Sequence, residues 1–137
     1  MAIAISPRDQ TEFVTKADRE LPPEQRTVFL LRPLTNVQRK LIEDQSLVMD
    51  GASGQAMPRM GSVKIEAVRA CLIGWRNFCD VDGSPVEFQT EGKRNVLGVN
   101  VEPPSPTSIN RLHPSDLAEI VDEIMAVSRT TVDEGKG

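Results

Sequence analysis

Aromatic side chains are scarce in this chain, which has one Trp, four Phe and no Tyr among 137 residues. Aliphatic side chains must therefore build most of the core, since hydrophobic residues make up 39% of the sequence. No apolar run approaches the roughly 18 residues that a membrane-spanning helix needs. The first eight residues lack the basic segment and long apolar stretch of a secretory signal. We therefore expect a small soluble protein that is made and used in a cytoplasm.

Histidine and cysteine are also rare, with one His and two Cys. A single His excludes a multi-histidine metal site, and His113 directly precedes Pro114, where a helix cap or surface position is expected. Cys71 and Cys79 are expected on one helix, roughly 12 Å apart, whereas a disulfide needs Cα atoms within about 7 Å. We interpret both cysteines as small buried hydrophobes in a reducing compartment.

Two short segments have some features of ligand-binding motifs. Counted from Asp80 as the first position of a calcium-binding loop, Gly83 stands at the fourth place, whereas that loop requires glycine at the sixth. An Asp-Gly turn explains the same residues more simply. The segment 51–54 lacks the Gly-Lys-Ser/Thr of a phosphate-binding loop. We therefore predict no catalytic residue, no cofactor site and no metal site, and hence no enzyme.

The net charge of −4 is concentrated at the C-terminal end. Residues 112–137 hold six acids and two bases, so residues 1–111 hold 14 of each and are neutral. Such a distribution repels phosphate backbones, which argues against a nucleic-acid partner. The alternative is that these acids form only a solvated helix face. No membrane partner is expected either.

The hydrophobic patterning predicts one α+β domain. Strands are expected near 27–32, 86–89 and 96–101, in one small antiparallel sheet. Amphipathic helices are expected near 36–49, 63–78 and 115–128. Thr35 and Gln38 match a capping box at the start of the first helix, and Pro114 suits the first position of the last. Trp75 is expected to anchor the core from the middle helix, the alternative being a partner contact.

The domain is expected to span residues 27–131. Residues 1–26 are polar and hold Pro22-Pro23, so a loosely ordered segment is predicted there. Glycines, prolines and serines predict a flexible surface loop over 50–61, and three prolines predict a stiff linker over 103–106. Residues 132–137 are expected to form a flexible tail.

Two segments carry a resemblance to a known family. Segment 21–35 reads LPPEQRTVFLLRPLT, and segment 68–83 reads VRACLIGWRNFCDVDG, followed by Val86-Glu87-Phe88. A strand ending in Arg-Pro-Leu-Thr, a later Gly-Trp-x-Asn-Phe-x-Asp-x-Asp-Gly pattern and a C-terminal helix resemble small tail-module proteins of long-tailed bacteriophages. The tail assembly chaperones are the most similar in style. The resemblance runs from about residue 21 to residue 130.

The resemblance implies a role in binding rather than catalysis. Such chaperones coat the hydrophobic, helical tape measure protein while tail tube subunits assemble, and then leave. The implied partners are the tape measure and tail tube proteins, in a bacterial host cytoplasm, with weak self-association. Two alternatives remain: a structural virion protein of the tail or head–tail junction, and a cytoplasmic regulator or inhibitor that binds a host protein.

Overall fold

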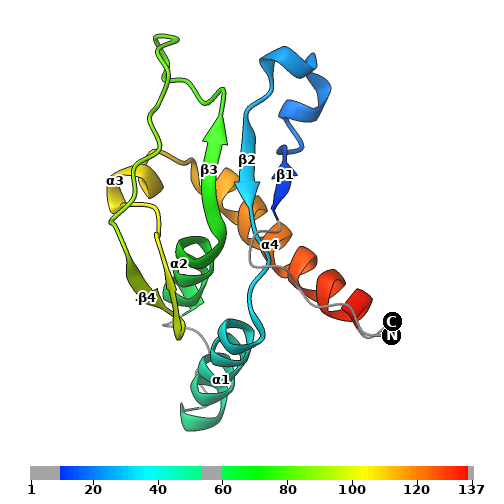
Figure 1. Ribbon diagram of the computed structural model, residues 1–137, viewed down its shortest axis with the longest axis vertical. Coiled ribbons are helices and arrows are strands. Elements are labelled where there is room, and N and C mark those ends of the chain that lie inside the picture. Colours follow the sequence, from blue (N-terminus) through cyan, green and yellow to red (C-terminus); the bar gives the residue numbers. More distant parts are fainter. Residues whose placement is uncertain (1–9, 54–59, 136–137) are drawn as a thin grey trace.

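The computed structural model describes residues 10–53 and 60–135, and it confirms the α+β class with small antiparallel sheets. Side chains are described for residues 10–44 and 63–128. Figure 1 shows the arrangement. The elements in chain order are β1 (Thr11–Phe13), 3-10 turns η1 (Asp18–Glu20) and η2 (Pro23–Gln25), β2 (Val28–Leu31), α1 (Asn36–Ser53), α2 (Met60–Cys71), β3 (Leu72–Arg76), β4 (Arg94–Val96), β5 (Val99–Val101), α3 (Pro106–Ile109) and α4 (Pro114–Gly135).

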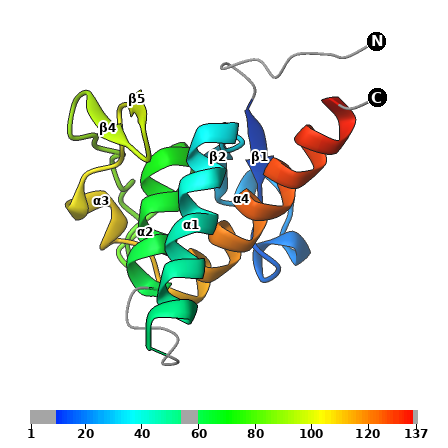
Figure 2. The same ribbon diagram turned by 90° about the horizontal axis from the view of Figure 1, so that it is seen from below.

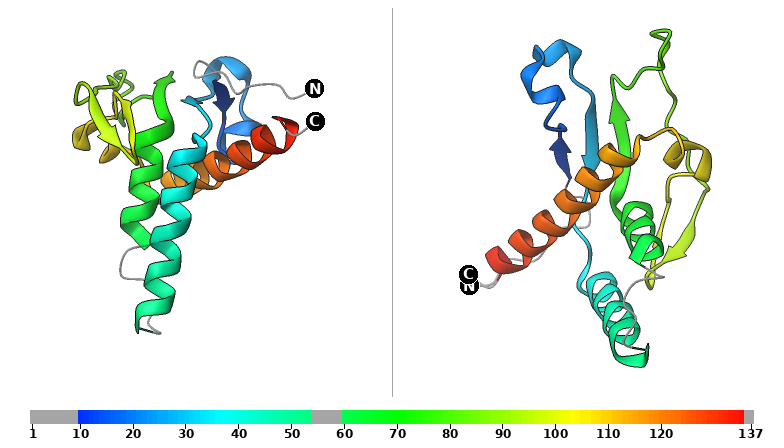
Figure 3. Two further views of the ribbon diagram at one scale, coloured as in Figure 1. Left: turned by 60° about the horizontal axis from the view of Figure 1, so that its bottom comes forward. Right: turned by 180° about the vertical axis from the view of Figure 1, so that it is seen from behind.

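The main sheet has three antiparallel strands in the order β1-β2-β3. Phe13 pairs with Phe29, which pairs with Trp75, so three aromatic side chains share one row across the sheet. Helix α4 crosses the face that these side chains occupy, as Figure 3 (right) shows from behind. Ile120 and Ile124 of α4 are fully buried in the same core. This packing explains the apolar face that the sequence predicts for α4.

Helices α1 and α2 lie side by side and project from one end of the sheet (Figures 2 and 3). The predicted capping box at the start of α1 is confirmed. The Gln38 N–H donates to Thr35 Oγ1 at 3.1 Å, and the Thr35 N–H donates to Gln38 Oε1 at 3.0 Å. Gln38 is fully buried, and its amide also donates to the Val96 carbonyl at 3.3 Å. The cap therefore ties α1 to the β4–β5 hairpin.

The prediction of one helix over 63–78 is wrong. Helix α2 ends at Cys71, and the chain continues directly into strand β3. Trp75 consequently lies on a strand, where it is half-buried against the core. The spacing of Val68, Leu72 and Trp75 fits a helix, but Leu72 and Gly74 also alternate with exposed Ile73 as in a strand. Pairing with β2 decides between the two, because it joins β3 to the sheet.

The prediction of sheet strands over 86–89 and 96–101 is also wrong. Residues 86–89 are extended without a ladder, between single bridges at Pro85 and Thr90. The segment 96–101 holds a turn, so β4 and β5 form a separate hairpin. Leu97 and Gly98 have φ angles of 51° and 81°, as a type I′ turn requires. A Cβ at Gly98 would lie 3.0 Å from Val37 Cγ1, so the hairpin packs closely on α1.

Order extends further than predicted at both ends. Strand β1 and the two 3-10 turns lie within the segment 1–26, which was expected to be loosely ordered. Helix α4 reaches Gly135, inside the expected tail 132–137. Helices α1 and α2 occupy the margins of the expected loop 50–61. The expected linker 103–106 includes buried Pro103 and Pro104 and the start of α3. Residues 1–9, 54–59 and 136–137 lie outside the described residues.

Candidate protein-binding site

One face of the main sheet has no described element packed on it (Figure 1), and we call it the open face. Side chains alternate between the two faces of a strand. Phe29 and Leu31 of β2 are buried on the α4 side, so Val28 and Leu30 point to the open face. Register places five residues on this face, namely Glu12, Val28, Leu30, Gly74 and Arg76.

The open face is more apolar than a solvated sheet face. A strand with one wet face normally alternates apolar and polar residues, whereas a continuous apolar run is typical of strands covered on both sides. Strand β2 reads Val-Phe-Leu-Leu, and its outward Val28 and Leu30 are only half-buried. Leu30 lies over Gly74, where a Cβ would be 3.5 Å from Leu30 Cδ1. Strand β2 therefore carries more apolar side chains than the described chain covers.

Charged and apolar groups border this face. Arg76 of β3 pairs with Glu12 of β1 across β2. Ile73 sits at the irregularity in the β2–β3 register and is 39% exposed. The β2–β3 surface thus combines an apolar strip with one ion pair, as protein-contact surfaces do.

Arg32 caps the junction between α2 and β3. Its backbone N–H donates to the Cys71 carbonyl at 3.0 Å, and its Nε donates to the Ala70 carbonyl at 2.8 Å. These carbonyls belong to the last turn of α2, where no further helical N–H follows to donate to them. The same turn carries the negative end of the helix dipole, which favours a cation. Arg32 therefore stabilises the point at which the helix becomes a strand.

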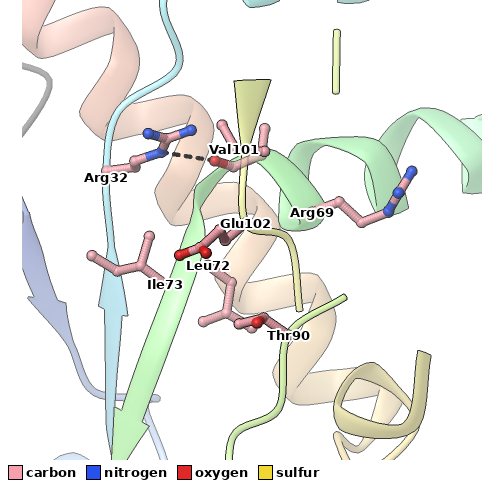
Figure 4. A pocket seen from close by; sticks show the side chains of 8 residues that line it. Arg32, Arg69, Leu72, Ile73, Thr90, Val101 and Glu102 are labelled. Atoms are coloured by element: carbon pink, nitrogen blue, oxygen red, sulfur yellow. Dashed lines mark hydrogen bonds between the residues drawn. The ribbon is translucent and has the colours of Figure 1, made fainter. Parts of the chain in front are cut away.

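A pocket of about 230 Å³ opens beside this junction (Figure 4), and we call it the Arg32 pocket. Its walls come from the residue after β2, the end of α2, the start of β3, the segment before β4 and the end of β5. Four of the lining residues are apolar and four are polar or charged. The lining residues are Arg32, Arg69, Ala70, Leu72, Ile73, Thr90, Val101 and Glu102.

The two arginines of the pocket differ in how their donors are used. Arg69 donates to Glu66 at 2.8 Å and to Glu91 at 3.3 Å. The hydrogen bond to Glu66, with the contribution of Glu91, raises the pKa of Arg69 against the opposing effect of burial. Arg32 makes no described ion pair, and its Nη2 is buried with no acceptor among the described residues. Arg32 therefore retains unused hydrogen-bonding capacity.

The residues that carry the family resemblance hold the other end of the sheet together. Trp75 Nε1 donates to the Val86 carbonyl at 2.8 Å, and its ring meets Phe78 and Phe88 edge-on at centroid distances of 4.8 Å. Asn77 has a φ of 57°, and its side chain donates to the carbonyls of Glu24 and Arg26 at 3.1 Å. These contacts fix the loops at this end.

The Asp80–Asp82 segment forms the expected turn. The Gly83 N–H donates to the Asp80 carbonyl at 2.9 Å, and Gly83 has a φ of 86°. The Ser84 hydroxyl and N–H hold the pKa of Asp82 below its usual value. The Val81 N–H and Arg111 do the same for Asp80. Within the described chain, no three His, Cys, Asp or Glu side chains converge as a metal site would need.

The cysteines and His113 lie apart from this surface. Cys71 is fully buried at the end of α2, and burial raises the pKa of its thiol to about 12. Cys79 is exposed and lies beyond β3, so the expectation that both cysteines are buried on one helix is wrong. His113 is exposed just before α4, and its carbonyl accepts from the Leu117 N–H at 2.9 Å. The structure does not bring these residues together into a site.

Sequence reasoning missed the open face and the Arg32 pocket. The apolar run at 28–31 was the available signal for the face. No helix among the described residues is long and apolar enough to cross a membrane. Comparison of the chain with protein-family models, curated proteins and solved structures finds no match.

Proposed function

We propose that this chain is a non-enzymatic protein-binding module, a tail assembly chaperone of a long-tailed bacteriophage that binds the tape measure protein. The observation that carries the binding role is the open face of the sheet. Val28 and Leu30 of β2 give that face the composition of a covered surface. The resemblance of segments 21–35 and 68–83 supports the more specific assignment to tail assembly.

The open face suits an apolar helix better than an added strand. An added strand would pair with an edge of the sheet through its backbone. The open face instead offers side chains, with Leu30 over Gly74 and Val28 on the same side of β2. A helix lays an apolar stripe onto such a surface. A hydrophobic helical protein such as a tape measure provides many stripes of this kind.

Co-expression tests the proposal. The chain should raise the soluble fraction of the matching tape measure protein and co-purify with it. A Leu30→Asp variant should fold but lose both effects, because it places a charge on the apolar contact. Val81→Asp is the matched control, since Val81 is fully exposed on a distant turn. An insoluble partner and no recovered complex would refute the proposal.

Mature particles distinguish the chaperone from a structural virion protein. A chaperone leaves before the tail is complete, so purified particles should lack this chain. Its presence in particles at a fixed copy number per tail would favour a tail or head–tail junction component instead.

A further inference from the structure

The Arg32 pocket has the chemistry of a small carboxylate site. A guanidinium has five N–H donors in a planar fork that matches a carboxylate. Arg32 uses Nε on the Ala70 carbonyl at 2.8 Å, and Nη2 is buried without an acceptor among the described residues. An unpaired buried donor is costly, and more so on a charged group. An acceptor that enters the pocket would remove this cost.

The dimensions and walls of the pocket limit what enters it. About 230 Å³ is smaller than the roughly 300–1,000 Å³ of sites for drug-sized ligands. It is many times the roughly 10–15 Å³ that a site for one water needs. Leu72, Ile73 and Val101 supply apolar walls next to the guanidinium. A short aliphatic stem that ends in a carboxylate matches both features.

The position of the pocket identifies the source of the carboxylate. Arg32 directly follows β2, and alternation along the chain puts its side chain on the same side as Leu30, so the pocket lies at the end of the open face. A helix that lies on the open face can therefore direct a side chain into the pocket, and the partner chain need not end at the pocket. We infer that the Arg32 pocket binds the side-chain carboxylate of a glutamate or aspartate in the partner that covers the open face.

Glu102 opposes the entry of a second carboxylate into the Arg32 pocket. Its carboxylate lies among the pocket residues in Figure 4 but makes no described ion pair with Arg32. A second carboxylate in the pocket is repelled by Glu102 and attracted by Arg32. Removing the Glu102 charge should therefore strengthen binding of a carboxylate, whereas replacing the Arg32 fork should abolish it.

Two isomeric probes test the inference in the absence of any protein partner. N-acetylglutamic acid α-amide carries only a side-chain carboxylate, and N-acetylglutamine carries only a main-chain carboxylate. We expect the first to shift the Arg32 Nε–H and Ile73 methyl NMR signals in a saturable way at constant ionic strength. The second isomer and the neutral N-acetylglutamine amide should shift these two signals at least about tenfold less at equal concentration. A roughly tenfold difference is what the loss of one charge-assisted hydrogen bond produces.

Variants make the result specific. Arg32→Lys keeps the charge and a donor for Ala70 but loses the fork, so saturable shifts should disappear while the amide spectrum stays folded. Glu102→Gln should tighten binding about fivefold, as one partly screened charge contact does. Equal shifts from both isomers, no shift in the natural chain, or unchanged binding by Arg32→Lys would overturn the inference. The identity of the partner rests on the proposed function, whereas the titration does not depend on it. Failed co-expression together with a positive titration would therefore refute only the proposed function.

Discussion

The side chain of Leu30 lies over Gly74, across the β2–β3 pair, with 3.5 Å between Leu30 Cδ1 and the position of a Cβ at residue 74. This contact lies on the uncovered side of the sheet. Leu31, the next residue, is fully buried on the α4 side. Neighbouring leucines of one strand therefore have different roles, and substitution separates them.

Leu30→Ser should leave the fold stable, with a loss below about 1.5 kcal/mol, because Leu30 is only partly buried. Leu31→Ser should cost about 3–5 kcal/mol, since it leaves a cavity and a buried hydroxyl. Urea unfolding measures both. Similar losses for the two variants would mean that the open face is part of the core.

Trp75→Ala should destabilise the protein by about 3 kcal/mol, the lower part of the range for large aromatics, because Trp75 is half-buried. Trp75→Phe should cost about 1 kcal/mol, since it keeps a ring in the cluster but removes the hydrogen bond to the Val86 carbonyl. The midpoint of urea unfolding reports both values. An unchanged midpoint in Trp75→Ala would remove Trp75 from the core.

Asn77 combines a left-handed backbone with two side-chain hydrogen bonds. Asn77→Gly loses the bonds but adopts a φ of 57° without strain, whereas Asn77→Ala loses the bonds and is strained. Asn77→Ala should therefore be the less stable by about 1 kcal/mol. Thermal unfolding of the pair checks this order, and the reverse order would show that the backbone at 77 is not left-handed in solution.

The start of α1 was predicted from the sequence because a capping box is local: Thr35 and Gln38 satisfy each other's backbone N–H groups. The end of α2 was not predicted because the apolar residues at 68, 72 and 75 fit a helix, and only the short alternation at 72–74 fits a strand. Pairing of β3 with β2, more than 40 residues earlier in the chain, decides the outcome. Strand β1 has only three residues and was missed for the same reason.

The site was harder to predict than the fold. The Arg32 pocket brings together residues from 32 to 102, and no local motif marks it. The resemblance segments include Arg32 and Trp75, yet their spacing does not show that Arg32 caps a helix that ends at Cys71. The open face depends on which side of the sheet α4 covers, which the pattern of β2 alone does not specify.

The two thiols should differ sharply in reactivity. Only the thiolate attacks alkylating and disulfide reagents. Burial raises the pKa of Cys71 to about 12, so this thiol stays protonated at neutral pH. Cys79 is exposed. A colorimetric thiol assay should detect one fast-reacting cysteine in the native protein and two in denaturant. Two fast cysteines in the native state would contradict the burial of Cys71.

Acid should weaken the turn at Asp80–Asp82. The folded state lowers the pKa of both carboxyls, so their contribution is complete above the unfolded pKa and is lost as pH falls through the lower folded pKa. Urea unfolding between pH 7 and pH values below about 4 should therefore show a larger loss for the natural chain than for Asp80→Asn/Asp82→Asn. Glu87→Gln, at an exposed carboxylate with no described hydrogen bond, is the control and should lose as much as the natural chain.

Methyl NMR of this chain mixed with the proposed partner, a tape measure protein, locates the binding surface. We expect the methyl signals of Leu30 and Ile73 to shift or broaden on binding, while those of Val81, the most exposed apolar side chain described, stay unchanged. Changes confined to Val81 and its turn, with Leu30 and Ile73 unaffected, would contradict the assignment of the open face as the binding surface.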